Sequence, residues 1–293
     1  MELSVVIPVS GRRELLCRCL RSLNSAAEVA YEVCAVDDGS GLDEQGIRKE
    51  ADVSFPLIWR SFDTPRGRSA ARNEGIRSTT GGIIVFIDSD MEAGEGFLEA
   101  HRTGHRDHPH TAVIGRIIWP DTGGFIRYIG SRGVAKLTAD DPVPPWYFVT
   151  GNSSVTREDL PSENPFDETL PGWGGEDLDL GMKLSRCGIT FKHVPDAVSF
   201  HHFEGTLRDH VERTFRYGAS ALPVLARRYP EIMNATGLNH LDSVFWRMLI
   251  HGCIFRPAVL IAGLCDPLPL PFALYDYLTF AAYARGWMKG TSP

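Results

Sequence analysis

The hydrophobic and polar positions of residues 1–90 alternate between two periods. Short apolar runs, rich in β-branched residues and too brief for helices, predict strands at 3–9, 31–36, 57–62 and 82–87. Between them, apolar residues at helical spacing predict helices over 12–24 and 69–78. Near-continuous apolar strands separated by helices indicate a parallel sheet covered on both faces, so we expect an α/β fold.

Polar clusters follow three of these predicted strands, at 8–11, 37–40 and 88–90. Sheets of this class bind ligands beyond the carboxyl ends of their strands. We therefore expect a ligand site built from these three clusters.

The later part of the chain has a less regular pattern. It predicts a loop at 138–146, a strand at 146–155, a helix over 176–187, and short strands at 189–193 and 197–200. From Leu207 onward the pattern is mostly helical.

An apolar stretch runs from 244 to 283, but charged residues and prolines interrupt it. No uninterrupted apolar run reaches the ~18–20 residues that span a bilayer. Two interpretations remain open. The stretch forms buried helices that cap the domain, or it forms an interfacial surface that touches lipid or an apolar acceptor.

The length and the charge of the chain limit the number of domains and the kinds of partner that we expect. The 293 residues allow one large domain or two modest ones. With 30 basic and 37 acidic side chains, the net charge of −7 argues against a nucleic-acid partner, which needs a basic face. The charge is uneven: 207–293 carries a net +3 and 1–206 a net −10. This asymmetry indicates two regions with different partners.

The cysteines and the first residues of the chain indicate the cellular compartment in which the protein is expected. The six cysteines are scattered and contain no CxxC pair, so we expect free thiols in a reducing environment. No basic-then-apolar signal segment opens the chain. The expected location is cytoplasmic, with peripheral contact at the inner face of the membrane as an option for the tail.

The strand predicted at 82–87 ends in a pair of carboxylates, Asp88 and Asp90. On an extended segment, residues two apart point the same way, so both can project together while Ser89 turns aside. A divalent cation relieves their repulsion, and oxygen ligands favour Mg²⁺ or Mn²⁺. Alternatively, the segment is only a polar turn. The histidines at 101, 105, 108 and 110 also invite a metal interpretation, but a solvated helix face is expected there.

Four segments in chain order carry a family resemblance. They are Val5–Val9, the Val-Asp-Asp-Gly-Ser segment at 36–40, the Gly-Arg-Ser-Ala-Ala-Arg-Asn-Glu-Gly segment at 67–75 with the Asp-Ser-Asp that follows, and Pro-Gly-Trp-Gly-Gly-Glu-Asp at 171–177. Together they resemble the nucleotide-sugar glycosyltransferases of family 2, which have the GT-A fold. The resemblance covers residues 3 to about 206. It implies a catalytic domain at 1–206 and a helical extension at 207–293. Within that domain, 1–118 would be the nucleotide-sugar-binding half and 119–206 the acceptor and base half.

On the donor side, the resemblance implies a role for each matching residue. Asp38, with Asp37 as second choice, would hydrogen-bond the base, although Asp37 can equally cap the turn. Pro8 and Val9 would line the nucleotide pocket. Arg72 would lie near the diphosphate or ribose, with Arg66 and Arg68 as alternative cations. Asp88, with Ser89, would lie near the ribose or sugar.

The resemblance also implies a metal site and a base. Asp90 and a histidine, His201 before His202, would bind Mn²⁺ or Mg²⁺. Trp173 would offer a platform for the sugar, and Gly174 and Gly175 would let the backbone approach it. Asp177 would be the catalytic base, and Glu176 would hydrogen-bond sugar or acceptor hydroxyls; plain N-terminal capping is the structural alternative. Asp179 is expected to be solvated or supportive.

The expected function is therefore metal-dependent, inverting transfer from a nucleotide sugar, with UDP as the expected nucleotide. The acceptor could be a saccharide, a lipid-linked sugar, a peptide or a small natural product. Three alternatives remain: a retaining enzyme of the same fold, a non-catalytic nucleotide-sugar-binding subunit and a nucleotidylyltransferase. Asp177 disfavours a retaining enzyme, and the complete set of metal and base residues disfavours a non-catalytic subunit. A nucleotidylyltransferase would need a Gly-rich basic loop after the first strand, which this sequence does not have.

Overall fold

The computed structural model describes residues 2–26, 29–120, 123–202, 205–265, 268 and 270–291. The chain divides into two compact units. The first comprises Met1–Pro120, Arg132–Glu168 and Glu176–His202, and the second comprises Asp121–Ser131, Thr169–Gly175 and Phe203–Pro293. The two units interleave along the chain, and the functional boundaries expected at 118 and 206 stay predictions.

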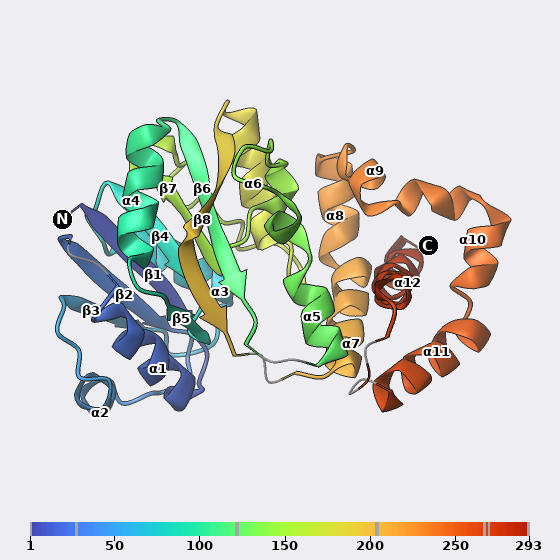
Figure 1. Ribbon diagram of the computed structural model, residues 1–293, viewed down its shortest axis with the longest axis horizontal. Helices are drawn as coiled ribbons and strands as arrows, with labels where there is room; N and C mark the ends of the chain where they lie inside the picture. The colour runs from blue at the N-terminus through green and yellow to red at the C-terminus, as the bar shows by residue number, and fades with distance from the viewer. Residues whose placement is uncertain are drawn as a thin grey trace. The chain divides into compact units, whose positions relative to one another are not determined.

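The first unit is built on one eight-stranded sheet, with strand order β3-β2-β1-β4-β7-β6-β8-β5. Its strands are β1 (Leu3–Val9), β2 (Tyr31–Asp37), β3 (Leu57–Ser61), β4 (Ile83–Ile87), β5 (Met91–Ala93), β6 (Thr111–Ile118), β7 (Asn152–Thr156) and β8 (Thr190–His201). Strands β3, β2, β1 and β4 are parallel, as are β6 and β8, whereas β7 and β5 pair antiparallel with their neighbours. The predicted parallel α/β core is confirmed (Figure 1).

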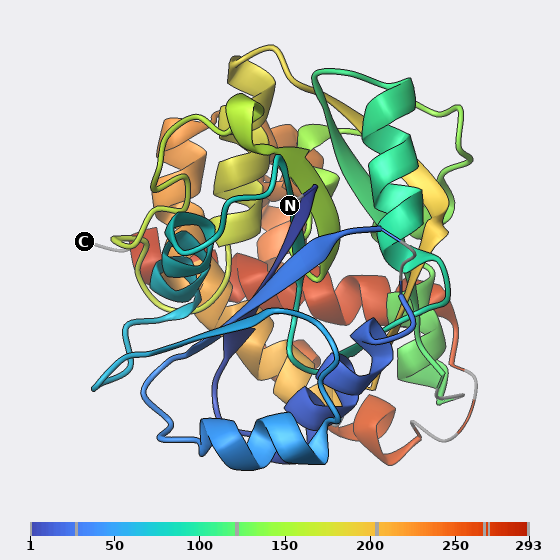
Figure 2. The same ribbon diagram turned by 90° about the vertical axis from the view of Figure 1, so that its left-hand side faces the viewer.

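Helices cover both faces of this sheet (Figure 2). They are α1 (Arg13–Leu23), α2 (Glu44–Glu50), α3 (Arg68–Arg77), α4 (Phe97–Asp107) and α6 (Glu176–Arg186). Successive side chains of a strand point to opposite faces. Val5 and Ile7 of β1 accordingly join one apolar cluster with α1 and α4, whereas Val6 joins another with α3 and α6. Because both faces are buried, β1 is apolar throughout, as its sequence indicated.

Two expectations for the middle of the chain are corrected. The strand expected at 146–155 begins only at Asn152, because Pro145–Tyr147 forms a short 3₁₀ helix that begins with proline. The two strands expected at 189–193 and 197–200 are one strand, β8. A β-bulge lets it pass Pro195, since the register against β6 jumps from Val194 to Val198.

The histidines of α4 do not form a solvated face, contrary to expectation. His101 is fully buried and bonds Ser154 Oγ at 2.8 Å and Asn152 Oδ1 at 3.0 Å. His105 is also buried and bonds the same Ser154 hydroxyl at 2.8 Å. Burial lowers the pKa of His101 to about 3 and that of His105 to about 4, so both rings are neutral and structural.

The second unit is helical, as the pattern after Leu207 predicted. Its elements are α5 (Gly124–Gly130), α7 (Leu207–Ala219), α8 (Ala221–Arg228), α9 (Ile232–Thr236), α10 (Val244–Leu249), α11 (Gly252–Leu264) and α12 (Phe272–Thr291). Helices α7 and α12 pack backbone to backbone. A Cβ on Gly218 would lie 2.2 Å from Tyr283 O, and one on Gly286 would lie 2.2 Å from Phe215 O. Glycine at these positions is therefore a packing requirement.

The apolar stretch of the tail is buried only in part. Helix α12 buries Tyr275, Leu278 and Ala281, as the capping interpretation expects. Helices α10 and α11 instead expose large apolar side chains, so that interpretation is wrong for them. Among the described residues, no helix combines the length and apolar character needed to cross a membrane. All six cysteines are free thiols, as expected.

Candidate active site

The buried arginine of α3 organises the candidate site of the first unit. The side chain of Arg72 is fully buried, and its Nη2 atom donates to Asp88 Oδ1 at 2.8 Å, just beyond the end of β4. Its Nη1 atom donates to Glu176 Oε1 at 3.1 Å and lies 3.8 Å from Asp177 Oδ1. One guanidinium thus joins the carboxyl end of β4 to the first turn of α6.

A second arginine completes this cluster of charges. Arg68 Nη2 lies 2.9 Å from Glu176 Oε1. Burial by itself would lower the pKa of Arg72, but Asp88, Asp177 and Glu176 outweigh burial and raise it, so Arg72 stays charged. The expected contact of Arg72 with a diphosphate or ribose stays a prediction. In the structure its guanidinium faces carboxylates.

The two carboxylates that open α6 have opposite pKa shifts. Burial acts to raise the pKa of Glu176, but Arg68 and Arg72 outweigh burial and lower it. Burial, reinforced by the charge of Glu176, raises the pKa of Asp177 to about 6 against the pull of both arginines. The hydroxyl of Thr150 donates to Asp177 Oδ1 at 2.7 Å and further favours the ionised form. The two arginines therefore favour the ionised form of Glu176, whereas burial and the charge of Glu176 favour the protonated form of Asp177.

The second carboxylate of the Asp-Ser-Asp segment faces a histidine. Strand β5 pairs with β8 in a register that sets Met91 opposite His201. His201 Nε2 consequently lies 3.5 Å from Asp90 Oδ2, and the ring of Trp119 lies beside the imidazole, with 4.3 Å between centroids. Burial tends to raise the pKa of Asp90, but His201 outweighs burial and lowers it.

These two residues fit part of a divalent metal site. A carboxylate oxygen and an imidazole nitrogen face one another, and both atoms are common ligands of Mn²⁺. Within the described ranges, no group of three or more His, Cys, Asp or Glu side chains converges on one point. His202, the alternative ligand, turns elsewhere: its Nε2 atom lies 2.9 Å from Glu92 Oε1. Oxygens of a bound ligand would have to complete the coordination.

The ends of β1 and β2 carry the predicted nucleotide contacts. Asp37 is fully buried, and its carboxylate accepts from the backbone N–H groups of Ser40 and Leu42, each at 3.1 Å. The carboxylate of Asp38 accepts from the N–H groups of Arg66 at 2.6 Å and Gly67 at 2.9 Å. Asp37 therefore shapes the turn, as the structural alternative anticipated, and Asp38 anchors the segment that leads into α3.

Pro8 and Val9 form the buried end of β1. The carbonyl of Val9 accepts from Asp38 N–H at 2.8 Å, which ties the two predicted nucleotide-pocket segments together. Ser89 lies between the two carboxylates of its segment and is half-buried.

The Trp-Gly-Gly segment belongs to the second unit. Trp173 is 45% exposed, and the guanidinium of Arg213 lies 5.5 Å from the centre of its ring. Gly174 and Gly175 have φ angles of 87° and 93°, a region that side chains with a Cβ avoid. A Cβ on Gly175 would also lie 2.7 Å from Leu225. Backbone conformation and packing therefore both require glycine at 175.

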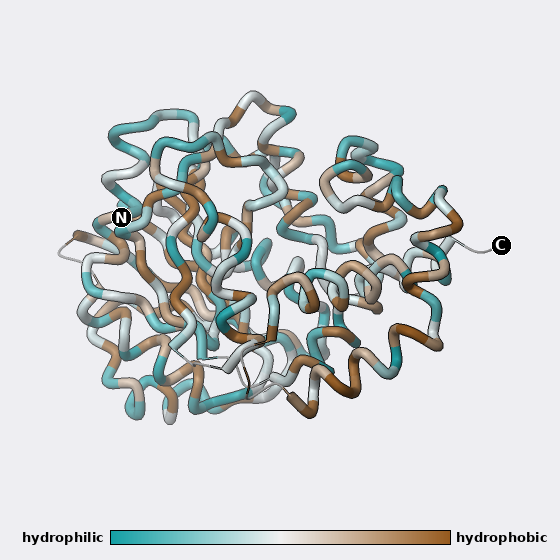
Figure 3. The backbone as a smooth tube through the Cα atoms, turned by 45° about the vertical axis from the view of Figure 1, so that its right-hand side comes forward, coloured by the Kyte–Doolittle hydropathy of each residue, from teal (hydrophilic) through white to brown (hydrophobic). Residues whose placement is uncertain are grey.

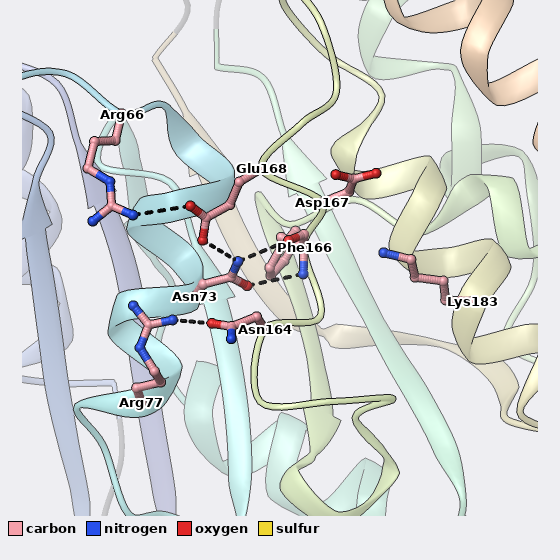
Figure 4. A pocket seen from close by; sticks show the side chains of 8 residues that line it. All are labelled: Arg66, Asn73, Arg77, Asn164, Phe166, Asp167, Glu168 and Lys183. Atoms are coloured by element: carbon pink, nitrogen blue, oxygen red, sulfur yellow. Dashed lines mark hydrogen bonds and ion pairs between the residues drawn. The ribbon is translucent and has the colours of Figure 1, made fainter.

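A separate polar cavity of about 540 Å³ lies in the first unit (Figure 4). Its lining residues are Arg66, Asn73, Arg77, Asn164, Phe166, Asp167, Glu168 and Lys183. Its cations have partners within the protein: Arg66 lies 3.2 Å from Glu168, and Lys183 lies 2.7 Å from Asp179. Arg66 and Lys183 are therefore both engaged by carboxylates of the protein itself. Asp179, expected to be solvated or supportive, is buried and paired with Lys183, so it is not solvated.

Four residues support the site although the sequence alone does not assign them this role: Arg68, Asn73, Thr150 and Phe166. Asn73 bonds the backbone N–H and C=O of Phe166, at 3.1 and 2.9 Å, and the ring of Phe166 lies 5.6 Å from the guanidinium of Arg72. Arg68 and Asn73 lie within the motif at 67–75, so the motif itself was the available signal. Nothing in the sequence around Thr150 or Phe166 indicates their roles.

Residues 4–160, more than half of the chain, match the family described as Glycosyl transferase family 2, and residues 135–206 match the N-terminal domain of galactosyltransferase. The chain is 28% identical over 254 residues to the uncharacterized glycosyltransferase YfnE of Bacillus subtilis, covering 69% of this chain and 64% of that protein. It is 31% identical over 239 residues to the pre-mycofactocin glycosyltransferase of Mycobacterium tuberculosis, covering 78% of this chain and 48% of that protein. The chain therefore belongs to glycosyl transferase family 2.

A solved structure shares the fold. The mannosyltransferase PcManGT of Pyrobaculum calidifontis, in complex with GDP-Man and Mn²⁺, superimposes with a TM-score of 0.69 at 19% identity. The match covers 98% of this chain and 88% of that one. The expected GT-A architecture is confirmed. The chain spans about half to two-thirds of the length of the two curated relatives.

Proposed function

We propose that this chain catalyses metal-dependent, inverting transfer of a sugar from a nucleoside diphosphate sugar to an acceptor hydroxyl. One arrangement carries the proposal: the guanidinium of Arg72 joins Asp88, beyond the end of β4, to Glu176, and Asp177 lies 3.8 Å from that guanidinium. Glu176 is held ionised by Arg68 and Arg72, whereas the pKa of Asp177 is raised to about 6. A general base works best when its pKa lies near the operating pH.

In the proposed reaction, the acceptor hydroxyl gives its proton to a carboxylate oxygen of Asp177. Its oxygen forms a bond to the anomeric carbon of the donor sugar. The bond from that carbon to the phosphate oxygen breaks, and its electron pair leaves with the nucleoside diphosphate on the opposite face. A base positioned in this way contributes about 10²–10⁴-fold to the rate.

The charges around Asp177 act on its pKa in opposite directions. Glu176, whose ionised form Arg68 and Arg72 favour, raises the pKa of Asp177, whereas the two arginines themselves lower it. Thr150 donates to Asp177 Oδ1 and fixes which carboxylate oxygen is left for the acceptor. Glu176, whose carboxylate is engaged by both arginines, is the positioning residue of the pair.

Asp90 and His201 would hold the divalent cation, Mn²⁺ or Mg²⁺, with diphosphate oxygens completing the coordination. When bound, the cation supplies Lewis-acid stabilisation of the charge on the departing diphosphate. The facing oxygen and nitrogen atoms support this assignment, as does the Mn²⁺ in the PcManGT complex. The pairing of His202 with Glu92 favours His201 as the ligand.

On the donor side, we propose that the base lies over the ends of β1 and β2, at Pro8, Val9 and Asp38. UDP is the proposed nucleotide, although PcManGT holds GDP-Man. Asp88 and Ser89 would lie next to the ribose or sugar. The acceptor is a saccharide, a lipid-linked sugar, a peptide or a small natural product.

A thermal-shift screen tests the proposed function. UDP-, GDP- and dTDP-sugars are each added with Mn²⁺, with Mg²⁺ or with a chelator. The cognate donor at 100 times its Kd should stabilise the native state by about 2.7 kcal/mol, and chelation should remove most of that effect. If no nucleotide sugar raises the melting temperature with either metal, the proposal fails.

A retaining reaction on the same fold is the alternative, and the anomeric configuration of the product separates the two. The proposal expects the configuration opposite to that of the donor, read from the anomeric proton coupling by NMR. Retention of configuration would contradict the role given to Asp177.

A further inference from the structure

The second unit carries an exposed apolar surface that the transfer reaction does not use. Large apolar side chains of α10 and α11 are exposed by between 47% and 76%; they are Val244, Phe245, Met248, Ile254, Leu260, Ile261 and Leu264. Figure 3 shows most of α11 in the hydrophobic colour. Large apolar side chains gathered in the exposed positions of two successive helices mark an interaction site.

Part of this surface is hollowed into a groove of about 900 Å³, called here the α7–α11 groove. Leu207, Val211 and Phe215 line it from α7, where the four-residue spacing sets them on one face. Val259 and Gly263 line it from α11. No atom lies within 4 Å of a Cβ built on Gly263, so the groove is open there.

Cations surround the groove. Arg208 and Arg256 are exposed beside it, and Arg285 reaches it from α12. Among the residues that the structure describes, Glu212 is the carboxylate in its lining, and it pairs with Arg216. From 243 to 265 the chain contains two arginines and no carboxylate. The occupant must therefore combine hydrocarbon with negative charge.

We propose that α10, α11 and the α7–α11 groove bind the surface of an anionic lipid bilayer. The exposed apolar side chains would enter the boundary between headgroups and acyl chains, the groove would take part of one acyl chain, and Arg208 and Arg256 would meet lipid phosphates. Interfacial helices with exposed Phe and Leu beside arginines bind membranes in this way. This proposal does not depend on the transfer reaction.

Two further observations favour a bilayer surface over other occupants. Helix α11 has 13 residues and contains Pro257, so it suits a position at the surface of a membrane rather than across it. A second copy of the chain, docked on this surface by two-fold symmetry, would bring two arginine-bearing surfaces together. Like charges that meet in this way oppose such a dimer.

Co-sedimentation of the 293-residue chain with lipid vesicles tests the proposal, with no nucleotide sugar present. We expect binding to vesicles of phosphatidylglycerol and phosphatidylcholine, little binding to pure phosphatidylcholine, and weaker binding as salt rises. The double variant Arg208→Glu/Arg256→Glu should lower the affinity by about tenfold or more. The control Arg227→Glu makes the charge change of one of these substitutions at an exposed position of α8 outside the groove, and it should weaken binding much less than Arg208→Glu or Arg256→Glu alone.

The apolar contribution is tested by Leu260→Ser/Leu264→Ser. Both side chains are mostly exposed, so circular dichroism and the melting temperature should stay near those of the unsubstituted chain while vesicle binding falls. Equal binding to neutral and anionic vesicles would overturn the proposal. So would no vesicle binding at all, or a concentration-dependent dimer that the Leu260→Ser/Leu264→Ser variant abolishes.

Discussion

The hydroxyl of Thr150 is the most direct handle on the proposed base. Thr150 is fully buried and donates to Asp177 Oδ1 at 2.7 Å. Thr150→Val replaces the hydroxyl with a methyl group of similar size, so it removes the hydrogen bond without opening a cavity. The ionised form of Asp177 loses a donor, whereas its protonated form loses much less. The pKa of Asp177 must therefore rise.

The size of the rise follows from the energy of the bond. A hydrogen bond to a charged group contributes about 1.5–3 kcal/mol. One pKa unit corresponds to about 1.36 kcal/mol, so we expect a rise of about 1–2 units. Asp177 would then titrate at about 7–8 in the variant, against about 6 in the unsubstituted protein.

A titration of the protein labelled with ¹³C at the aspartate carboxyl carbons measures this pKa without any substrate. The resonance of Asp177 is assigned by its disappearance in Asp177→Asn. Thr150→Ser keeps the hydroxyl and serves as the matched control, with an inflection near that of the unsubstituted protein. The reasoning would be refuted if Asp177 of the unsubstituted protein titrated near pH 4. It would also be refuted if the pKa of Asp177 were the same in Thr150→Val as in the unsubstituted protein.

Three further predictions follow from the same structure. Arg72→Met should destabilise the fold by about 3–5 kcal/mol in urea unfolding. That loss should be larger at pH 8 than at pH 5, because protonation relieves the carboxylates left behind; an equal loss at both pH values would contradict it. His201→Ala should weaken Mn²⁺ binding in the presence of a nucleoside diphosphate by roughly tenfold or more, with His202→Ala close to unchanged in calorimetry; the reverse order would make His202 the ligand. Gly218→Ala should lower the free energy of unfolding by about 1–3 kcal/mol, because the added methyl group would collide with the backbone of Tyr283. Gly263→Ala, where the space is open, should leave the free energy of unfolding unchanged or raise it. Equal melting temperatures of the two variants would count against the close packing of α7 on α12.

Much of the first unit was predictable because its strands are buried on both faces. Short, continuous apolar runs such as those of β1, β2 and β4 are typical of strands in the middle of a parallel sheet. The carboxyl ends of such strands lie at one edge of the sheet, so the polar clusters that follow them meet there. The prediction failed where tertiary contacts decide. His101 and His105 look like solvated polar residues, yet the hydroxyl of Ser154, about 50 residues away, pairs with both.

The candidate site shows the same division. The carboxylates at 88, 90, 176 and 177 were singled out from motifs, but the sequence could not show that the guanidinium of Arg72 joins Asp88 to Glu176. That contact spans 104 residues and depends on how α3 and α6 cover one face of the sheet. The role of Thr150 likewise rests on a neighbour 27 residues away.

The central claim is that Asp177 takes the proton of the acceptor. Single-turnover transfer by Asp177→Asn, measured beside donor affinity by calorimetry, tests it most directly. The amide keeps the shape of the side chain and cannot accept that proton, so we predict donor affinity close to normal and transfer slower by about 10²–10⁴-fold. Transfer at a rate close to that of the unsubstituted protein, with donor bound normally, would contradict the claim.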